Sequence, residues 1–268
     1  MTKIRLVGIG MLPQRDLTAG GLAALRASKV VLYSSFPHLR PWLGSLGLSR
    51  IEDICDHYAD GGKDVDNYTA IVGAVVGAAR RNGDVAYLVP GHPNLGVTAT
   101  QRFLAMAATD DELDVEVVPG VSSIDTISMD LSLDLLERTC VIVDSNRLLL
   151  LRQQLDPRAG VLVYHASAVG TTTTDYREPW ITNRIELLQR YLVDTFGEDH
   201  EYHAVVSQTV PGVRPRVSRG TLGKLSEAVR SIDYGTTLYV PPIVKRGVDE
   251  NFLRLLDSGV AATRGARE

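Results

Sequence analysis

Residues able to hold or move a proton gather in one polar stretch at 56–67, with the sequence DHYADGGKDVDN. The stretch holds His57, Tyr58 and Lys63 together with four aspartates, and Tyr68 follows at the start of an expected helix over 68–82. A loop of this length and polarity between regular elements is typical of a lid or a substrate loop. A plain solvated connection fits the same residues equally well, so chemistry at this loop needs support from the rest of the chain.

A second candidate lies at the turn inside residues 84–101, DVAYLVPGHPNLGVTATQ. Residues 85–89 form a short apolar run, which is typical of a strand buried on both faces. The Pro and Gly residues at 90–94 end that strand, and a helix is expected from near Thr98. Ligands of open parallel sheets bind at the carboxyl ends of the strands, so we expect this turn to present backbone groups to a ligand. A sharp strand-to-helix connection without a ligand is the alternative.

A glycine turn, Gly8-Ile9-Gly10, follows the first expected strand and lets another segment or a ligand approach the backbone closely. The dinucleotide-binding pattern needs a third glycine three residues further on, where this chain has Met11-Leu12-Pro13. Pro13 cannot stand in the interior of a phosphate-binding helix. The sequence therefore disfavours a nicotinamide or flavin site, and it contains no GxxxxGK[ST] loop for nucleotide phosphates.

The elements that position these residues alternate between strand and helix, which predicts an α/β protein with a right-handed doubly wound sheet in its first half. There we expect strands at 3–7, 30–33, 50–54, 85–89 and 115–118, and helices at 18–28, 40–46, 68–82 and 98–108. The second half has strand-like runs at 141–144, 161–164, 203–206 and 236–240, with helices near 146–155, 183–196 and 223–232. We predict two α/β domains, at 1–137 and 138–268, with the last residues from about 260 frayed.

Two polar stretches of the second half, at 171–179 and 211–220, connect its elements. The stretch 210–220 carries three arginines, which fit either a basic loop near an anionic group or a hairpin with solvated edges; we favour the hairpin.

Composition restricts the class of protein. The 268 residues are 44% hydrophobic and 22% charged, with a net charge of -4, which argues against non-specific binding to nucleic acid or a membrane surface. Two cysteines, Cys55 and Cys140, cannot build a disulfide framework and lack the spacing of a metal site. The chain starts directly with a strand and has no apolar run of membrane-spanning length, so we expect a cytoplasmic protein.

Four segments in this order resemble the tetrapyrrole methylase family of S-adenosylmethionine-dependent methyltransferases. They are the glycine turn at 8–10, LVPGHPNLGV at 88–97, EVVPGVSSID at 116–125 and TTLYVPP at 236–242. The resemblance implies two α/β domains with the cofactor in the cleft between them, usually in a homodimer. Carried over by motif, the cofactor contacts are Gly8, Gly10, Pro90, His92, Leu95, Gly96, Val97, Ser122, Ser123, Tyr164, Ser207, Thr237 and Leu238.

A narrower similarity lies in HYADGGKDVDNYT at 57–69 and PGVSSIDTISMDLSLD at 119–134, with GHPNLGV between them. These runs are similar to the peptide backbone α-N-methyltransferases of the borosin pathway, in which tyrosines and an arginine around this loop act on the target amide. Tyr58 and Tyr68 fall on two of the tyrosine positions, whereas Cys55 stands at another and Asp64 at that of the arginine. Lys63, beside it, lacks the rigid fork of donors of an arginine. The sequence given lacks the long C-terminal extension in which some borosin enzymes carry their substrate, so we expect a separate peptide.

The resemblance implies chemistry in which the methyl donor is already activated, so no metal is expected and the protein must orient the acceptor and remove its proton. A backbone amide is barely acidic, so it needs a base and donors to its oxygen. A tyrosine is a poor base at neutral pH unless a neighbour stabilises its phenolate, which Lys63 or His57 could do for Tyr58. The competing interpretation is that Tyr58 and Tyr68 only anchor the loop by packing their rings. We expect His92 to shape the turn, and His38, His165, His200 and His203 to be structural or exposed.

The leading hypothesis is a methyltransferase of natural-product biosynthesis that N-methylates backbone amides of a peptide. One alternative changes the acceptor to a small metabolite or a corrin precursor, although the acidic loop would repel a polycarboxylate. Another is a non-catalytic cofactor-binding subunit, which the residues at 55 and 64 motivate.

Overall fold

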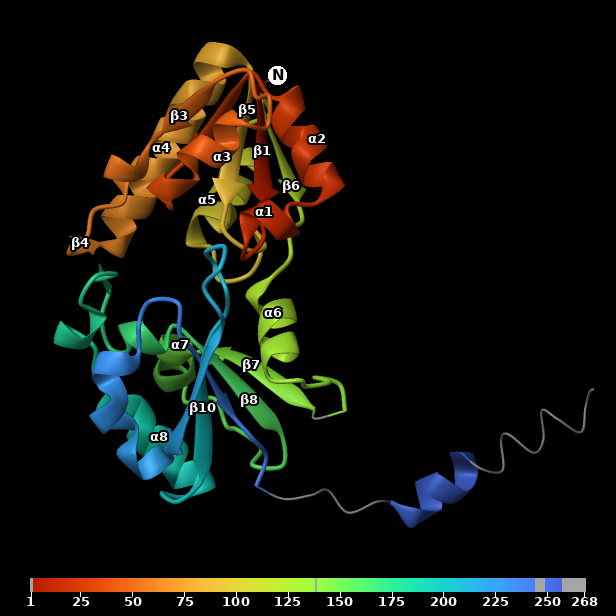
Figure 1. The fold of residues 1–268 in the computed structure, drawn as a ribbon, viewed down its shortest axis with the longest axis vertical. Coiled ribbons are helices and arrows are strands. Elements are labelled where there is room, and N and C mark those ends of the chain that lie inside the picture. Colours follow the sequence, from red (N-terminus) through yellow and green to blue (C-terminus); the bar gives the residue numbers. More distant parts are fainter. Residues whose placement is uncertain (1, 138, 244–248, 257–268) are drawn as a thin grey trace, which may run out of the picture.

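The chain forms two five-stranded sheets, which lie one above the other in Figure 1. This computed structural model describes residues 2–137, 139–243 and 249–256. The first sheet is wholly parallel and has the order β3-β2-β5-β1-β6. Its strands are β1 (Thr2–Gly8), β2 (Val30–Tyr33), β3 (Ile51–Asp53), β5 (Asp84–Val89) and β6 (Leu113–Val118).

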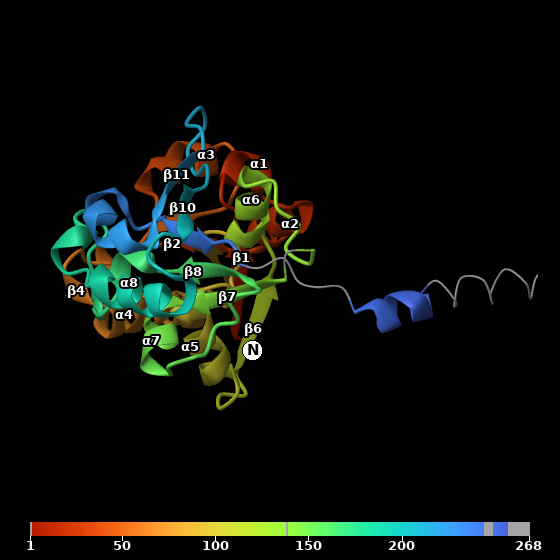
Figure 2. The same cartoon turned by 90° about the horizontal axis from the view of Figure 1, so that it is seen from below.

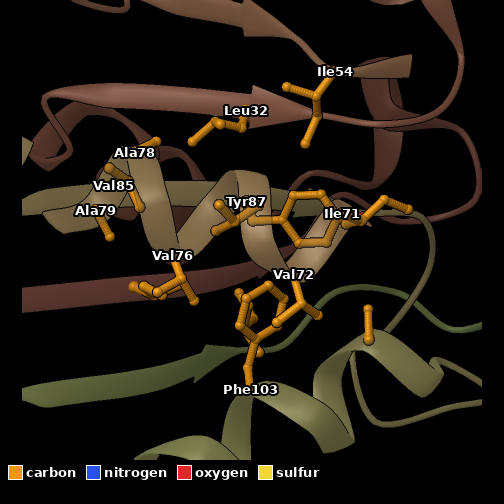
Figure 3. Close-up of a cluster of buried hydrophobic side chains, with 14 of the residues drawn as sticks. Leu32, Ile54, Ile71, Val72, Val76, Ala78, Ala79, Val85, Tyr87 and Phe103 are labelled. Carbon is orange, nitrogen blue, oxygen red and sulfur yellow. The ribbon is translucent and has the colours of Figure 1, made fainter. Parts of the chain in front are cut away.

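Helices cover both faces of this first sheet. Four helices, α2 (Ala19–Ala27), α3 (Arg40–Gly44), α4 (Asp64–Asn82) and α5 (Thr98–Ala107), follow strands along the chain, and the short α1 (Pro13–Asp16) precedes α2. Alternate residues of the strands face opposite helices: Tyr87 and Val85 pack with α4 and α5 (Figure 3), whereas Leu88 and Ala86 pack with α2 and α3. Because helices cover both faces of the sheet, the sequences of its central strands are nearly unbroken apolar runs.

The second sheet is mixed, with the order β11-β10-β12-β8-β7. Its strands are β7 (Cys140–Asp144), β8 (Gly160–Tyr164), β10 (Glu201–Val206), β11 (Arg216–Thr221) and β12 (Thr237–Val240). On one face lie α7 (Ser145–Leu150), α8 (Ile185–Phe196) and the 3₁₀ helix η5 (Leu222–Ser231), and on the other lies α6 (Ser123–Asp130), as the view in Figure 2 also shows. The carboxyl ends of β8 and β10 and the start of β12 share one edge.

Short elements join the two halves. The two-residue strands β4 (Gly62–Lys63) and β9 (Thr173–Thr174) pair across them as an antiparallel ladder. Four 3₁₀ turns, η1 (Pro37–Leu39), η2 (Cys55–His57), η3 (Ala166–Ala168) and η4 (Pro179–Ile181), complete the connections.

Helix α4 begins at Asp64, four residues earlier than predicted, so the polar loop ends at Lys63 instead of Asn67. Asp64 and Asp66 occupy the first turn, where negative side chains are stabilised by the partial positive charge of a helix start. The amide of Asn67 also folds the loop back, since it accepts a hydrogen bond from the Ala59 N–H and donates one to the Ala59 carbonyl.

Two further predictions about local structure were wrong. The expected helix near 223–232 is the 3₁₀ helix η5. The helix near 146–155 is α7, capped at its start by the Asp144 side chain and ended before Arg152, which has a positive φ of 47°. The hairpin that we preferred over a basic loop at 210–220 is confirmed. Strands β10 and β11 pair along their full length, and the first four residues of β11 are exposed.

Helix α6 has an unexpected position in the fold. Although it follows β6 of the first sheet, its Ile127 packs against Leu162 and Val205 of the second sheet. The predicted division at 137 and 138 stays a prediction, and the predicted frayed residues from 260 lie outside the described part. Within that part, no helix combines the length and the apolar character needed to cross a bilayer.

Candidate active site between the two sheets

A cavity of about 740 Å³ lies between the two halves of the chain. Its volume is in the range of small-molecule sites. The first half contributes residues from β4, α4, the turn after β5 and α5, and the second half contributes residues from the ends of β7 and β8, α7 and the threonine run. The lining includes Lys63, Asp64, Tyr68, Gly96, Val97, Arg102, Asp144, Arg147, His165, the four threonines at 171–174, Asp175 and Tyr234.

Tyrosines from both halves meet beside this cavity. The hydroxyl oxygens of Tyr58 and Tyr234 are 2.7 Å apart, and the rings of Tyr58 and Tyr68 are 6.1 Å apart between centroids. Tyr58 also stacks on Tyr176, with centroids 6.4 Å apart. The structure thus brings together the two tyrosines predicted from the sequence and adds Tyr234, which the sequence analysis did not single out.

The electrostatic setting keeps these phenols protonated. Burial, followed by the neighbouring Tyr234, raises the pKa of Tyr58 well above the ordinary value of a phenol. Burial and the adjacent Tyr58 raise the pKa of Tyr68 in the same direction. Burial raises the pKa of Tyr234 to about 12, and because 45% of this residue is exposed, the effect belongs to its enclosed hydroxyl end. The cluster is therefore a group of neutral hydrogen-bond donors at neutral pH.

The two candidate helpers of Tyr58 are both exposed. Lys63 lines the cavity, and its backbone pairs with Thr173 in the β4–β9 ladder. His57 lies at the end of η2 and is not among the residues that line the cavity. The raised pKa of the Tyr58 hydroxyl argues against a phenolate there.

Asp60 of the polar loop and Asp64 at the start of α4 are tied to the second half by hydrogen bonds. Asp64 accepts a short hydrogen bond from the Thr174 hydroxyl, and Asp60 accepts one of 2.9 Å from the Tyr176 N–H. These contacts close the loop onto the segment after η3. Asp64 therefore holds two segments together at the position where the borosin resemblance expects an arginine.

An arginine nevertheless lies beside Tyr68, on another element. The guanidinium carbon of Arg102, on α5, is 5.9 Å from the centre of the Tyr68 ring. Its Nη1 donates to the Thr69 hydroxyl at 2.7 Å and to the Val65 carbonyl at 3.2 Å, so it is fixed against the first turns of α4. Nothing in the local sequence pattern of α5 indicated this contact.

The second half contributes a histidine and an aspartate that the sequence analysis missed. The Nδ1 atom of His165 is 2.7 Å from Oδ2 of Asp144, and both residues line the cavity. Burial alone would raise the pKa of Asp144, but hydrogen bonds from His165 and from the Arg147 N–H hold that pKa below its ordinary value. One signal was available, because both residues follow neighbouring strand predictions, and the carboxyl ends of parallel strands meet at one edge.

Of the predicted cofactor contacts, Gly96 and Val97 line the cavity. Gly96 has a positive φ of 68°, and a Cβ atom there would come within 3.2 Å of Cε1 of His165. His92 shapes the turn, since its Nδ1 accepts a hydrogen bond of 3.1 Å from the Asn94 N–H.

The other predicted contacts are outside the cavity lining but gather at the two facing sheet edges. At the first edge are the ends of β1, β5 and β6 and their turns, with Gly8, Gly10, Pro90, His92, Leu95, Ser122 and Ser123. At the second edge are Tyr164, Ser207, Thr237 and Leu238. The edges touch, because the hydroxyl oxygens of Ser123 and Tyr164 are 3.0 Å apart. Ser122 caps α6, and Ser207 donates to Asp130 at 2.7 Å.

The glycines at the first edge pack against one another. A Cβ atom on Gly8 would lie 2.6 Å from the Gly120 nitrogen and 2.7 Å from the Gly91 oxygen, and Gly10 pairs with Gly91 in an isolated bridge. The close approach of the turns therefore explains the absence of side chains at 8 and 120, and a positive φ of 67° explains it at 91. Their backbone groups still border the space between the sheets.

Comparison with known proteins finds similarity to methyltransferases. The family model described as Tetrapyrrole (Corrin/Porphyrin) Methylases matches residues 3–226. The chain is 22% identical over 255 residues to the methyltransferase/ribosomally synthesized cyclic peptide dendrothelin A precursor of Dendrothele bispora, covering 94% of this chain and 60% of that protein. It is also 22% identical to the methyltransferase/ribosomally synthesized type I borosin cyclic peptide precursor of Mycena rosella, covering 99% of this chain and 66% of that protein.

Solved structures share the fold. The uroporphyrin-III C-methyltransferase from Thermus thermophilus in complex with S-adenosylhomocysteine aligns with a TM-score of 0.60 at 18% sequence identity, covering 90% of this chain and 98% of that one. This chain spans about 60% of the length of the Dendrothele bispora relative.

Proposed function

The chain belongs to the tetrapyrrole methylase family, and from this premise we propose that it is an S-adenosylmethionine-dependent methyltransferase of natural-product biosynthesis that N-methylates backbone amides of a peptide. The observation that carries the peptide version is the group of neutral tyrosine hydroxyls beside the cavity, formed by Tyr58, Tyr68 and Tyr234. The names of the Dendrothele bispora and Mycena rosella relatives, which join a methyltransferase and a cyclic peptide precursor, support it.

The residues present fit the cofactor. Gly96 leaves its backbone open to the cavity because a side chain there would meet His165, and Val97 adds an apolar surface beside it. We propose that these two residues, with the backbone and hydroxyl groups at the two sheet edges, hold S-adenosylmethionine. When bound, it supplies a methyl group on a positively charged sulfonium, which an amine or amide nitrogen can accept. The bound S-adenosylhomocysteine of the Thermus thermophilus enzyme supports this assignment.

An amide acceptor explains why neutral tyrosines are useful. When an amide nitrogen loses its proton, negative charge develops on the carbonyl oxygen, and preorganised donors stabilise it. Phenols with raised pKa values stay protonated and can donate. We therefore propose that Tyr58 and Tyr68 donate to the acceptor oxygen, with the guanidinium of Arg102 near them, in place of the phenolate base considered from the sequence.

The charges of the cavity favour a peptide over a polycarboxylate tetrapyrrole. Three basic side chains in its lining are balanced by three acidic ones: Lys63, Arg102 and Arg147 against Asp64, Asp144 and Asp175. A site for several carboxylates would be expected to carry an excess of positive charge. The four threonines at 171–174 add short hydroxyl groups, which suit a neutral peptide backbone.

We also propose that the protein is a cytoplasmic homodimer that receives the peptide as a separate chain. The edge strand β7 supports a dimer because its Val141 and Ile142 are 37% and 43% exposed. Leu150 at the end of α7 and Leu151 directly after it are exposed as well. An apolar edge strand is a template for pairing with a second copy. Both cysteines are free, which suits a reducing compartment.

The test is formation of S-adenosylhomocysteine when the protein is given S-adenosylmethionine and one of three acceptor classes. The classes are unmodified peptides, small amines, and a polycarboxylate tetrapyrrole. Turnover with peptides alone is the expected result. Turnover with another class would reassign the acceptor, and cofactor binding without any turnover would support the non-catalytic alternative.

A further inference from the structure

A paired histidine and aspartate, His165 and Asp144, lie in the cavity wall on the half opposite Tyr68, and the sequence analysis gave neither a role in the chemistry. We propose that His165 is the base that takes the proton from the acceptor nitrogen, with Asp144 as the residue that positions it. This inference rests on the proposed function, because it supplies a group that amide methylation needs and that the protonated tyrosines cannot provide.

The backbone fixes the imidazole in place. His165 directly follows β8 and has a left-handed backbone conformation with a φ of 56°. A non-glycine residue in this conformation is strained and persists when its surroundings hold it, often at functional sites. Here the buried Ser145 hydroxyl donates to the His165 carbonyl at 2.9 Å. Asp144 and Tyr164 are paired in the β7–β8 register, so the carboxylate lies beside the start of this turn.

The pairing leaves one nitrogen of the ring available. Asp144 is ionised at neutral pH because its hydrogen bonds keep its pKa low, so it accepts the proton of Nδ1. Nε2 then carries a lone pair. A Cβ atom on Gly96 would lie 3.2 Å from Cε1 and 3.4 Å from Nε2, so this edge of the ring faces Gly96 across space that a side chain would fill. Gly96 and His165 both line the cavity, and the free nitrogen therefore lies at the cavity wall beside Gly96.

The ring and the tyrosine cluster border the same short segment. His165 contacts the position of Gly96, and Thr98, two residues further on, interacts with the hydroxyl of Tyr68. Two extended residues span at most about 7 Å. An acceptor amide between them can place its oxygen toward Tyr68 and its N–H toward His165. The tyrosine donors and the His165 base would then lie on opposite sides of the planar acceptor amide.

The step balances without another reactant. The proton of the acceptor nitrogen passes to Nε2, the electron pair left on nitrogen forms the bond to the incoming methyl carbon, and the electron pair of the broken carbon–sulfur bond stays on sulfur. The imidazolium, stabilised by Asp144, afterwards releases its proton to solvent.

Other charged side chains of the cavity lining surround the same ring. They are Asp64, Asp175, Arg147, Arg102 and Lys63. Asp144 is hydrogen-bonded directly to the ring, so its effect on the imidazolium is the strongest by proximity.

The experiment compares wild-type protein with His165→Gln, Asp144→Asn and the control His38→Gln, an exposed histidine on η1. The first readout is the pH dependence of kcat and kcat/KM, measured with a peptide that the wild-type protein methylates. The second is the affinity for S-adenosylhomocysteine, measured by calorimetry. His165→Gln should lower kcat about 100-fold or more and remove the acidic limb of the pH profile, with unchanged affinity. Asp144→Asn should lower kcat less and move that limb to lower pH, because the ring loses its anionic partner.

Each outcome separates the two proposals. If the wild-type protein methylates peptides and His165→Gln keeps both its kcat and its acidic limb, the inference is overturned while the proposed function stands. If cofactor affinity falls as much as kcat, His165 is a cofactor-binding residue and the inference is equally overturned. If the wild-type protein binds the cofactor and methylates no acceptor, both proposals fall. Asp144→Asn keeps the test decisive should His165→Gln fail to fold.

Discussion

The hydroxyls of Tyr58 and Tyr68 are the groups on which the proposed reaction most depends. Tyr58 directly follows η2 and contacts Tyr234 of the second half, and Tyr68 lies on α4. Burial and a neighbouring phenol, Tyr234 for Tyr58 and Tyr58 for Tyr68, keep both hydroxyls protonated. A protonated phenol can donate to an oxygen that gains charge, whereas it cannot accept a proton from an amide. The site therefore divides the chemistry between donors on one half and the His165 base on the other.

Replacing Tyr68 by Phe removes one donor and keeps the ring under Arg102. We expect Tyr68→Phe to lower kcat by about 100-fold, with affinity for S-adenosylhomocysteine unchanged, because loss of one donor to a developing oxyanion has this magnitude. Tyr58→Phe should behave alike. Tyr176→Phe, which keeps the stack on Tyr58 and loses an exposed hydroxyl, is the matched control and should retain wild-type kcat. Equal loss of cofactor affinity in Tyr68→Phe would show that the residue only holds the loop.

Tyr87 gives a prediction about stability at alkaline pH. Its hydroxyl is 2.5 Å from that of Ser34, and burial raises its pKa to about 12. An unfolded tyrosine titrates near pH 10, so above that pH the unfolded chain loses its proton first and the folded state is disfavoured. The stabilisation of about 2 to 3 kcal/mol is complete below about pH 10 and is lost as pH rises to about 12. The urea midpoints of wild type and Tyr87→Phe should therefore differ at pH 8 and converge at pH 11, because only the wild type has this phenol to titrate.

The variant should be less stable by about 1 kcal/mol at the lower pH, since the Ser34 hydroxyl loses its partner. At the higher pH the difference should vanish. A constant difference at both values would mean that Tyr87 does not contribute to the alkaline loss.

The sequence predicted some site residues and could not predict others, for physical reasons. Gly96, Val97, Lys63 and Tyr68 line the cavity and lay in motifs with recognisable spacing. Tyr234 and Arg102 reach it only through the packing of elements far apart in the chain, which local pattern does not encode. His165 was assigned a structural or exposed role because the ends of two predicted strands, at 144 and 164, indicate a shared sheet edge but not a contact between these two side chains.

At the scale of elements, the turns after β1, β5 and β6 pack closely against one another at the carboxyl edge of the first sheet. Gly8→Ala places a methyl group 2.6 Å from the Gly120 nitrogen, a backbone atom that cannot swing away. We expect a loss of at least about 2 kcal/mol in the free energy of unfolding. Gly73→Ala, in α4, is the control: a Cβ there meets nothing within 4 Å, so helix propensity should stabilise the protein by about 0.5 to 1 kcal/mol.

Chemical denaturation of both variants measures the two effects. Equal stability of Gly8→Ala and wild type would contradict the close approach of the three turns. A destabilised Gly73→Ala would indicate that α4 has a neighbour at that face.

Long apolar elements were predicted best. The strands 30–33 and 85–89 and the start of α2 after its Thr18 cap agree with the structure, because burial on both faces and a capping hydroxyl are local signals. The first turn of α4 was missed because its aspartates and Asn67 read as loop residues. The 3₁₀ form of η5 and the packing of α6 on the second sheet follow from tertiary contacts that no local pattern fixes.

At the scale of the whole molecule, the edge strand β7 predicts the assembly. Ile142→Glu places a charge in the proposed interface between two copies and should convert a dimer to a monomer. Val213→Glu, 57% exposed on the β10–β11 hairpin, should leave the dimer unchanged. Size-exclusion chromatography with light scattering gives the mass of each. A monomeric wild-type protein, or a dimeric Ile142→Glu variant, would contradict the assignment.

The central claim is that the cavity between the two sheets methylates the backbone of a peptide. The most direct measurement is fragment mass spectrometry of a peptide incubated with S-adenosylmethionine and either the wild-type protein or Tyr68→Phe. The account predicts fragment ions that place each added methyl on a backbone amide nitrogen, with almost no product from the variant. Methyl groups on side chains, or the same backbone product in equal yield from Tyr68→Phe, would contradict it.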